Sequence, residues 1–170
     1  SEKIKVLEIL ATHKMKIDFS GGDPLYNPED FAIVERAVEI MPRDFIDISM
    51  TGVDFNEKKL ALLKKVGKVE ISIDNVPKDS NRFRPKGFNL SAINILKTLV
   101  EENIFCSAVT TLYPLSADKN NLKRLYELLC INQVPKWNIL RFYPVSRGLK
   151  LSNLYIDDEK TLELMDFLDS

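Results

Sequence analysis

A glycine pair followed by an acidic residue and a proline, Gly21-Gly22-Asp23-Pro24, is the first segment whose residue types could do chemistry. Glycine adopts positive φ readily and has no side chain, so a ligand can approach the backbone and be held by its N–H and C=O groups. Asp23 adds one negatively charged acceptor, and Ser20 precedes the pair. A tight turn between a strand and a helix is the plainer alternative, because glycine pairs are common at turns.

Ser72 and Asp74 form the second candidate pair. Side chains two residues apart on a strand lie on the same side, because successive side chains alternate between the two faces. A hydroxyl and a carboxylate on one side suit a diol such as a ribose. In the alternative interpretation, Asp74 begins an Asx turn and Ser72 bonds only to backbone.

A short basic segment follows, with Arg82, Arg84 and Lys86. An arginine there could bind a carboxylate or phosphate through paired hydrogen bonds, although many such loops are simply solvated. His13 is the only histidine, so acid–base catalysis by a histidine-containing dyad has no second candidate. We therefore interpret His13 as a structural or surface residue.

The elements that must position these residues follow from the apolar periodicity, which alternates regularly between helical and extended patterns. Asn27-Pro28 and Asn56 are expected to start helices, and Pro42 and Gly67 to end them. The pattern predicts helices over residues 2–12, 27–41, 56–65, 90–102, 118–131 and 157–168. It predicts strands over residues 16–19, 45–50, 69–74, 104–111 and 137–143.

Strands separated by helices in strict alternation predict an α/β fold, with a parallel sheet and helices outside it. No linker or low-complexity tract interrupts residues 1–170, so a single domain is expected. The series starts and ends on a helix. We therefore expect that an upstream first strand is missing and that the N-terminal edge of the sheet is uncovered.

Polar residues follow or end every predicted strand. They are Ser20 to Asp23, Thr51 with Gly52, Ser72 with Asp74, Thr110 with Thr111, and Arg141 with Tyr143. In parallel α/β folds the carboxyl ends of the strands meet at one rim, where ligands gather. The sequence therefore predicts one polar ligand site built from all five strand ends.

The composition narrows the function classes. Lys and Arg number 24 against 25 Asp and Glu, which gives a net charge of −1 and no electrostatic case for a nucleic-acid or membrane partner. No segment has the length or apolar character of a signal peptide or a membrane span, so a cytoplasmic protein is expected. Cys106 and Cys130 stand in apolar segments, which favours reduced, packed thiols over a disulfide or a metal cluster.

With these strand ends in order, the sequence resembles the radical S-adenosylmethionine superfamily, whose partial (βα)6 barrel carries Gly-Gly-Glu-Pro after its second strand. The matching segments lie between residues 16 and 148, each at a strand end or in the loop after it. They are Gly21-Gly22-Asp23-Pro24, Met50-Thr51-Gly52, Ser72-Ile73-Asp74, Arg84-Pro85-Lys86-Gly87-Phe88 and Arg141-Phe142-Tyr143-Pro144-Val145-Ser146-Arg147-Gly148. The nearest similarity is to the branch of molybdenum-cofactor and SPASM-type maturases, which modify peptides or mature cofactors.

The resemblance implies a partial (βα)6 TIM-like barrel, with its first strand missing here, and a site for S-adenosylmethionine. The Gly21-Gly22-Asp23 backbone would hold the methionyl amino group, and Ser20, Pro24 and Thr51 would belong to the same cofactor site. In the same resemblance Ser72 and Asp74 would hold the ribose, Arg84 the methionyl carboxylate, and Val109 and Tyr143 would border the adenine. The implied activity of the parent protein is reductive cleavage of S-adenosylmethionine, its small-molecule partner, to a 5′-deoxyadenosyl radical that abstracts hydrogen from a substrate, in peptide or protein modification or in cofactor maturation.

The sequence departs from the family at several points. Asp23 replaces the usual Glu, and Gly52 follows Thr51 directly where the family often has Thr-Asn-Gly. The family's Cys-x-x-x-Cys-x-x-Cys, whose thiolates hold a 4Fe-4S cluster, is absent, and Cys106 and Cys130 cannot replace it. We expect that the cluster loop precedes Ser1 in the parent and that residues 1–170 alone are inactive.

Two alternatives remain open from the sequence. The chain could be a cluster-free relative that keeps the barrel as a binding or scaffold module. It could also be an ordinary (βα) barrel enzyme that binds a phosphate at residues 20–22, although such a barrel needs eight units and only five or six are visible.

Overall fold

The structure is a computed structural model that describes residues 2–77 and 84–169, and the side chains of residues 146–148 are outside this description. Arg82, in the predicted basic loop, also lies outside the described residues. The described helices are α1 (Glu2–Thr12), α2 (Pro28–Ile40), α3 (Glu57–Leu63), α4 (Phe88–Glu101), α5 (Lys119–Ile131) and α6 (Asp158–Asp169). Two 3-10 segments are η1 (Arg43–Phe45) and η2 (Ser146–Leu154). The strands are β1 (Ile17–Phe19), β2 (Ile46–Met50), β3 (Lys68–Ser72), β4 (Cys106–Leu112) and β5 (Trp137–Arg141).

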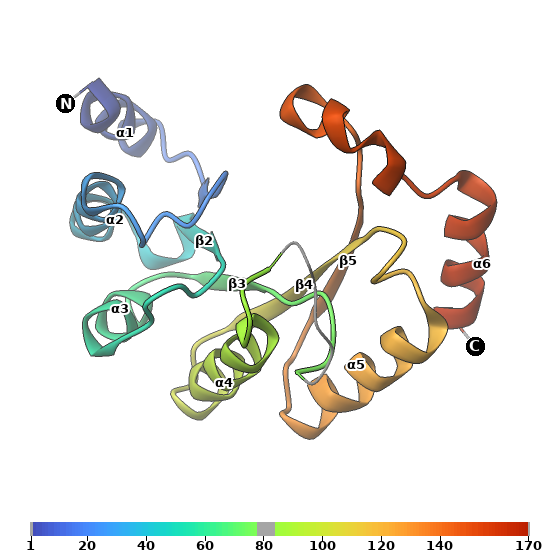
Figure 1. Cartoon of the computed structure of the whole chain (residues 1–170). Coiled ribbons are helices and arrows are strands. Elements are labelled where there is room, and N and C mark those ends of the chain that lie inside the picture. The colour runs from blue at the N-terminus through green and yellow to red at the C-terminus, as the bar shows by residue number, and fades with distance from the viewer. Residues whose placement is uncertain (1, 78–83, 170) are drawn as a thin grey trace.

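The five strands form one parallel sheet in the order β1-β2-β3-β4-β5. Consecutive strands are neighbours because each intervening helix returns the chain to the next position along the sheet. Figure 1 shows that the strands follow an arc, with α2 to α5 on its outer side and the inner side open. The prediction of an α/β partial barrel is confirmed, and among the described strands β1 neighbours only β2.

The two faces of the sheet differ in chemistry because side chains alternate along each strand. On the outer face Val69, Ile71 and Ile73 are fully buried against the helices. The intervening residues of the same segment, Glu70 and Ser72, are polar and half-buried on the inner face. The outer face thus carries the main core, and the inner face carries polar groups.

Asparagine caps start two of the helices, as the sequence predicts. Asn27 accepts a hydrogen bond from the backbone N–H of Glu29, with Pro28 in the first turn. Asn56 accepts one from the N–H of Lys59 at 3.1 Å. These bonds satisfy N–H groups that have no partner inside the helix, and they fix where the loops after β1 and β2 end.

Some predicted boundaries shift by one or a few residues. Phe45, expected in a strand, closes the 3-10 turn η1, because Pro42 starts a tight turn before β2. Residue 74 was expected in β3 and Tyr143 in β5, but these strands end at Ser72 and Arg141. The segment η2 was not predicted, since no apolar periodicity marks it.

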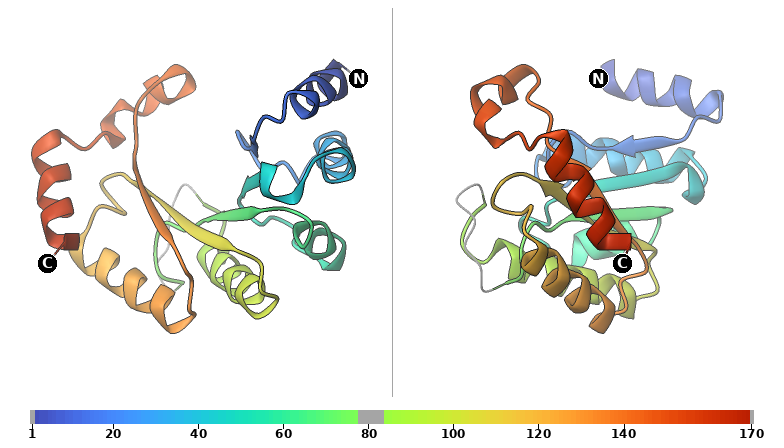
Figure 2. Two further views of the ribbon diagram at one scale, coloured as in Figure 1. Left: turned by 180° about the vertical axis from the view of Figure 1, so that it is seen from behind. Right: turned by 90° about the vertical axis from the view of Figure 1, so that its right-hand side faces the viewer.

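The carboxyl-terminal segment returns over the end of the sheet. A second apolar cluster joins β4, α5 and α6, with Leu112, Leu122, Ile156 and Leu164 as members. Figure 2 shows β5 leading into η2 and then into α6, which lies beside α5. The Arg141 side chain holds the segment between η2 and α6 against the end of β5, because its guanidinium donates to the backbone carbonyl of Ile156.

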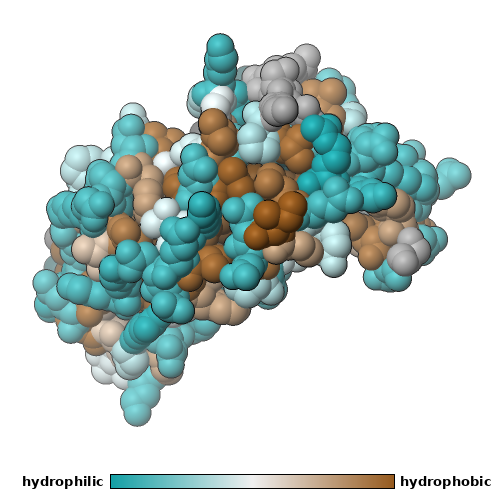
Figure 3. Space-filling view, turned by 90° about the horizontal axis from the view of Figure 1, so that it is seen from below, coloured by the Kyte–Doolittle hydropathy of each residue, from teal (hydrophilic) through white to brown (hydrophobic). Residues whose placement is uncertain are grey.

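The surface seen from below in Figure 3 is mostly hydrophilic, with hydrophobic side chains in small separate patches. Within residues 2–77 and 84–169, no helix combines the length and the apolar character that a bilayer crossing requires.

Candidate functional site

The Asp23 carboxylate joins the loop after β1 to the loop after β2. Its Oδ2 accepts hydrogen bonds from the Thr51 N–H (3.1 Å), the Thr51 hydroxyl (2.7 Å) and the Gly52 N–H (2.9 Å). Its Oδ1 accepts from the Leu25 N–H at 3.0 Å. Asp23 and Thr51, both predicted site residues, are therefore brought together. The carboxylate acts as an internal clamp that holds the glycine turn against the end of β2.

Two glycines in these loops are required by the backbone. Gly21 has φ of +91°, and a Cβ built there or on Gly22 would meet no atom within 4 Å. Gly52 has φ of +80°, and a Cβ there would collide with the Ile95 side chain. The Gly21-Gly22 backbone is thus open to a ligand, and it borders a groove of about 590 Å³ whose lining includes Ser20, Pro24 and residues of α1.

Ser72 and Val109 are neighbours at the carboxyl ends of β3 and β4, where they pair in the sheet register. Both are half-buried on the inner face. The Ser72 hydroxyl makes no hydrogen bond within the part of the chain that the structure describes. This hydroxyl is therefore free to hydrogen-bond a ligand, and the predicted role of Ser72 in binding stays a prediction.

Asp74 lies just beyond β3 and is almost fully buried, at 2% exposed. Its Oδ2 accepts a hydrogen bond from Arg84 Nε at 2.8 Å, and its Oδ1 lies 3.4 Å from the Thr111 N–H. The Arg84 guanidinium also lies over the Phe88 ring, 4.5 Å from its centroid. The two predicted residues Asp74 and Arg84 are thus an ion pair, in which Asp74 orients Arg84.

Tyr143 lies on the β5 side of the rim and is 60% exposed. Its ring makes an edge contact with Tyr155, with centroids 6.1 Å apart, and Arg141 lies over it at 5.4 Å. Within the described residues the structure shows no contact from Tyr143 to Ser72 or Asp23. The rim therefore brings Asp23 to Thr51, Ser72 to Val109, and Asp74 to Arg84, and leaves Tyr143 apart from these pairs.

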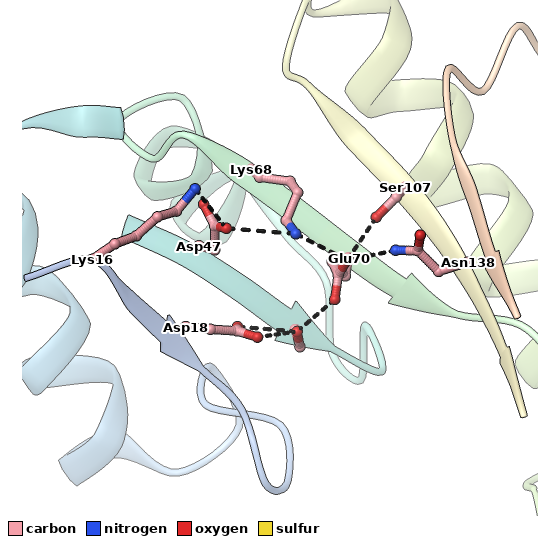
Figure 4. A network of polar contacts seen from close by, with 8 residues as sticks. Lys16, Asp18, Asp47, Lys68, Glu70, Ser107 and Asn138 are labelled. Carbon is pink, nitrogen blue, oxygen red and sulfur yellow. Dashed lines mark hydrogen bonds and ion pairs between the residues drawn. The ribbon is translucent and has the colours of Figure 1, made fainter. Parts of the chain in front are cut away.

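A second polar group, which the sequence analysis missed, runs across the inner face below the rim. We call it the interior row, and it takes one side chain from each strand: Asp18, Ser49, Glu70, Ser107 and Asn138. Figure 4 shows Ser107 and Asn138 pointing toward Glu70, with Asp18 farther away on the neighbouring side of the row. The Glu70 carboxylate accepts from Ser49 (3.1 Å), Ser107 (3.1 Å) and Asn138 (2.8 Å).

Two lysines and Asp47 extend the interior row toward the amino ends of the strands. Lys68 Nζ lies 3.1 Å from Glu70 and 3.5 Å from Asp47, and Lys16 Nζ lies 3.0 Å from the same Asp47 oxygen. Burial alone would raise the pKa of Glu70. The hydrogen bond and charge of Lys68, together with the Ser49 and Ser107 hydroxyls, outweigh that and lower the pKa below its usual value.

The strict alternation of polar and apolar residues along the strands is the sequence pattern from which the interior row could have been predicted. Polar residues occupy every second position of Asp47-Ile48-Ser49 and Lys68-Val69-Glu70. In a parallel sheet covered on both faces these positions would be apolar, so polar residues there indicate an open face.

The cysteines do not fit an iron–sulfur cluster. Cys106 is buried in β4, where burial raises the pKa of its thiol to about 11, and Cys130 is exposed on α5. Among the described residues, no three His, Cys, Asp or Glu side chains are grouped so as to hold a metal ion. A cluster therefore has no ligand set in the described part of the chain.

An open parallel sheet with polar groups at the carboxyl ends of its strands and helices on its outer side (Figure 1) defines an α/β protein with a partial barrel. The model of the Radical SAM superfamily matches residues 3–129, more than half of the chain. The chain belongs to the radical SAM superfamily.

Solved structures share the fold at low sequence identity. SuiB from Streptococcus suis bound to its precursor peptide SuiA superposes with a TM-score of 0.78 at 12% identity, over 98% of this chain and 38% of that one. SuiB bound to S-adenosylmethionine gives 0.73 at 11% identity, over 98% and 40%. A domain of pyruvate-formate lyase-activating enzyme from Bacteroides vulgatus gives 0.62 at 16% identity, over 91% and 93%.

The chain thus spans well under half the length of SuiB and nearly all of the activating-enzyme domain. A search of curated proteins gives no significant sequence match.

Proposed function

We propose that this chain is the S-adenosylmethionine-binding barrel of a radical enzyme that modifies a peptide or protein or matures a cofactor. The observation that carries the proposal is the family match over residues 3–129, a range that includes the open Gly21-Gly22 backbone. The likeness to SuiB, whose structures hold S-adenosylmethionine and a precursor peptide, supports this ligand and this substrate class.

The proposed role of each residue in binding S-adenosylmethionine depends on which of its polar groups are free to bind a ligand. The Gly21-Gly22-Asp23 backbone would bind the methionyl amino group, while the Asp23 side chain keeps that backbone in place through Thr51 and Gly52. The Nη groups of Arg84 make no hydrogen bond among the described residues, so they would bind the methionyl carboxylate.

Ser72, with its free hydroxyl, would bind the ribose together with Asp74. Val109, in β4, and Tyr143, just beyond β5, would border the adenine. Ser20 and Pro24 would shape the turn on either side of the glycines.

The cluster that the family uses would come from cysteines outside residues 1–170, since this sequence has two cysteines that lie far apart. When bound, such a cluster supplies the electron for cleavage of S-adenosylmethionine. We therefore propose that residues 1–170, as a single domain in the cytoplasm, bind S-adenosylmethionine but do not cleave it. A cluster-free binding module is the second candidate, favoured by the missing ligand set.

Calorimetric titration of the chain with S-adenosylmethionine tests the proposal. We expect saturable binding, weakened about tenfold in Arg84→Gln because one charged hydrogen bond contributes about 1.5–3 kcal/mol. Ser72→Ala should weaken it less, and Lys97→Gln, an exposed change on α4, should not alter it. Absence of binding to the wild-type chain would refute the proposal.

The reading frame upstream of Ser1 separates the two candidates. A Cys-x-x-x-Cys-x-x-Cys there supports the radical enzyme, and the parent protein should then release 5′-deoxyadenosine under reducing, anaerobic conditions. Its absence from the natural gene supports the binding module.

A further inference from the structure

We propose that the interior row binds a cationic nitrogen group of the substrate, an ammonium or a guanidinium, with Asp18 as its main acceptor. The inference rests on the proposed function in one respect, namely that the ligand belongs to the substrate. It concerns residues below the rim, none of which is assigned to S-adenosylmethionine.

The interior row has too few hydrogen-bond donors at its β1 end. Ser49 Oγ lies 3.1 and 3.2 Å from the two Asp18 oxygens and 3.1 Å from Glu70 Oε2. A hydroxyl has one proton, so it can donate to only one of these two carboxylates. The other carboxylate then faces hydroxyl lone pairs, an arrangement that a donor from a ligand would relieve.

The charges are also unbalanced toward the negative. Asp18, Asp47 and Glu70 carry three negative charges, against two positive charges from the lysines. Both lysines contact Asp47, and Lys68 also contacts Glu70. Asp18 is exposed on the inner face and has no cation within ion-pair distance among the described residues. A cationic ligand would supply the missing charge.

The Asp47 carboxylate independently indicates that this network has too few hydrogen-bond donors. This residue is 5% exposed, and its Oδ1 is buried without a hydrogen-bond partner in the described part of the chain. Both lysines approach its other oxygen. A buried carboxylate oxygen without a donor is costly, and donors that enter this network would allow one lysine to turn toward it.

The remaining members of the interior row also favour a donor ligand over an acceptor. Ser107 donates its only hydroxyl proton to Glu70, and Asn138 donates one of its amide protons there. Ser107 is fully buried, so of these two residues only Asn138 reaches the open inner face, where its amide oxygen is an acceptor that a donor could bind. The described carboxylates are not grouped as metal ligands, so an organic cation fits better than a metal ion.

Amide NMR shifts of the ¹⁵N-labelled chain test this inference with four small probes. N-acetyl-lysine N-methylamide and N-acetyl-arginine N-methylamide present the two side-chain cations, and glycine N-methylamide presents a free α-amine. N-acetyl-norleucine N-methylamide is the uncharged control. We expect at least one cationic probe to cause saturable shifts at Asp18, Ser49 and Glu70, and the strongest of the three identifies the source of the cation.

Asp18→Asn removes the charge at nearly constant volume, and we expect it to weaken that binding about tenfold. Asp166→Asn, the same change at an exposed site on α6, should leave it unaltered. Equal binding of the norleucine probe, no saturable shift with any cation, or unchanged binding in Asp18→Asn would overturn the inference. Glu70→Gln provides a second variant if Asp18→Asn loses its dispersed spectrum.

A parallel titration with S-adenosylmethionine separates this inference from the proposed function. Asp18→Asn should bind S-adenosylmethionine as the wild type does. If the chain binds the cation but not S-adenosylmethionine, the proposed function fails while the cation site stands. The converse result removes the cation site alone.

Discussion

Replacing Asp23 by alanine removes the clamp between the loops after β1 and β2. Four donors lose their acceptor, at 2.7 to 3.1 Å in the structure. A hydrogen bond to a charged group contributes about 1.5–3 kcal/mol, but four bonds to one carboxylate are not additive, and freed groups near the surface can bind water. We therefore expect a loss of about 3 kcal/mol in the free energy of unfolding, well below the sum of four separate bonds.

Urea unfolding followed by circular dichroism measures this loss. Thr51→Val removes only the hydroxyl bond at 2.7 Å and should cost about 1 kcal/mol. In the double variant the two losses should be less than additive, with a coupling energy of about 0.5–1 kcal/mol, because both changes remove the same bond. Asp166→Ala is the control for loss of an exposed carboxylate.

The affinity of Asp23→Ala for S-adenosylmethionine is a second measurement that tests the clamp. If Asp23 acts by holding the Gly21-Gly22 backbone, Asp23→Ala should weaken binding even where the chain is fully folded, and Asp23→Glu should recover part of it. A loss of stability below about 0.5 kcal/mol for Asp23→Ala, or full additivity with Thr51→Val, would show that the clamp reasoning is wrong.

Three further outcomes follow from the structure. The pKa of Glu70 is lowered from 4.5 in the folded chain, so its ionised carboxylate stabilises the fold above about pH 4.5, and this stabilisation is lost as the pH falls through the lowered pKa. Glu70→Gln should therefore reduce the loss of unfolding free energy below about pH 4.5, measured by urea unfolding at several pH values. An unchanged pH dependence contradicts this. Iodoacetamide at pH 8 should label Cys130 and not Cys106 in the native chain, because the Cys106 thiol is buried with a pKa of about 11, and mass spectrometry would detect label on Cys106 if that is wrong. Leu96→Ala, at a fully buried position of α4, should cost about 2–5 kcal/mol in urea unfolding, and a loss under about 1 kcal/mol would mean that the core collapses around the site.

The order of elements and the position of the rim were predictable from the sequence because they depend on local patterns. Apolar residues at every second position, as in Val69-Glu70-Ile71, mark a strand with one buried face. Asn27 and Asn56 cap helices through bonds to N–H groups two or three residues away. These interactions join near neighbours in the chain, so a short window of sequence contains all that they need.

The partners of the site residues were not predictable in this way. Asp23 takes donors from Thr51 and Gly52, and one carboxylate oxygen of Asp74 accepts from Arg84. Residue types at the strand ends indicate that polar groups meet at the rim. They do not indicate which acceptor satisfies which donor, because loop geometry after each strand decides that.

The interior row depends on tertiary structure most of all. Glu70 collects its contacts from β2, β4 and β5, and Asn138 lies 68 residues away along the chain. Alternation within each strand determines which residues face inward, and the sequence alone contains that. Only the register between parallel strands and the curvature of the sheet bring one residue from each strand to the same carboxylate, since both arise from packing of the whole sheet against its helices.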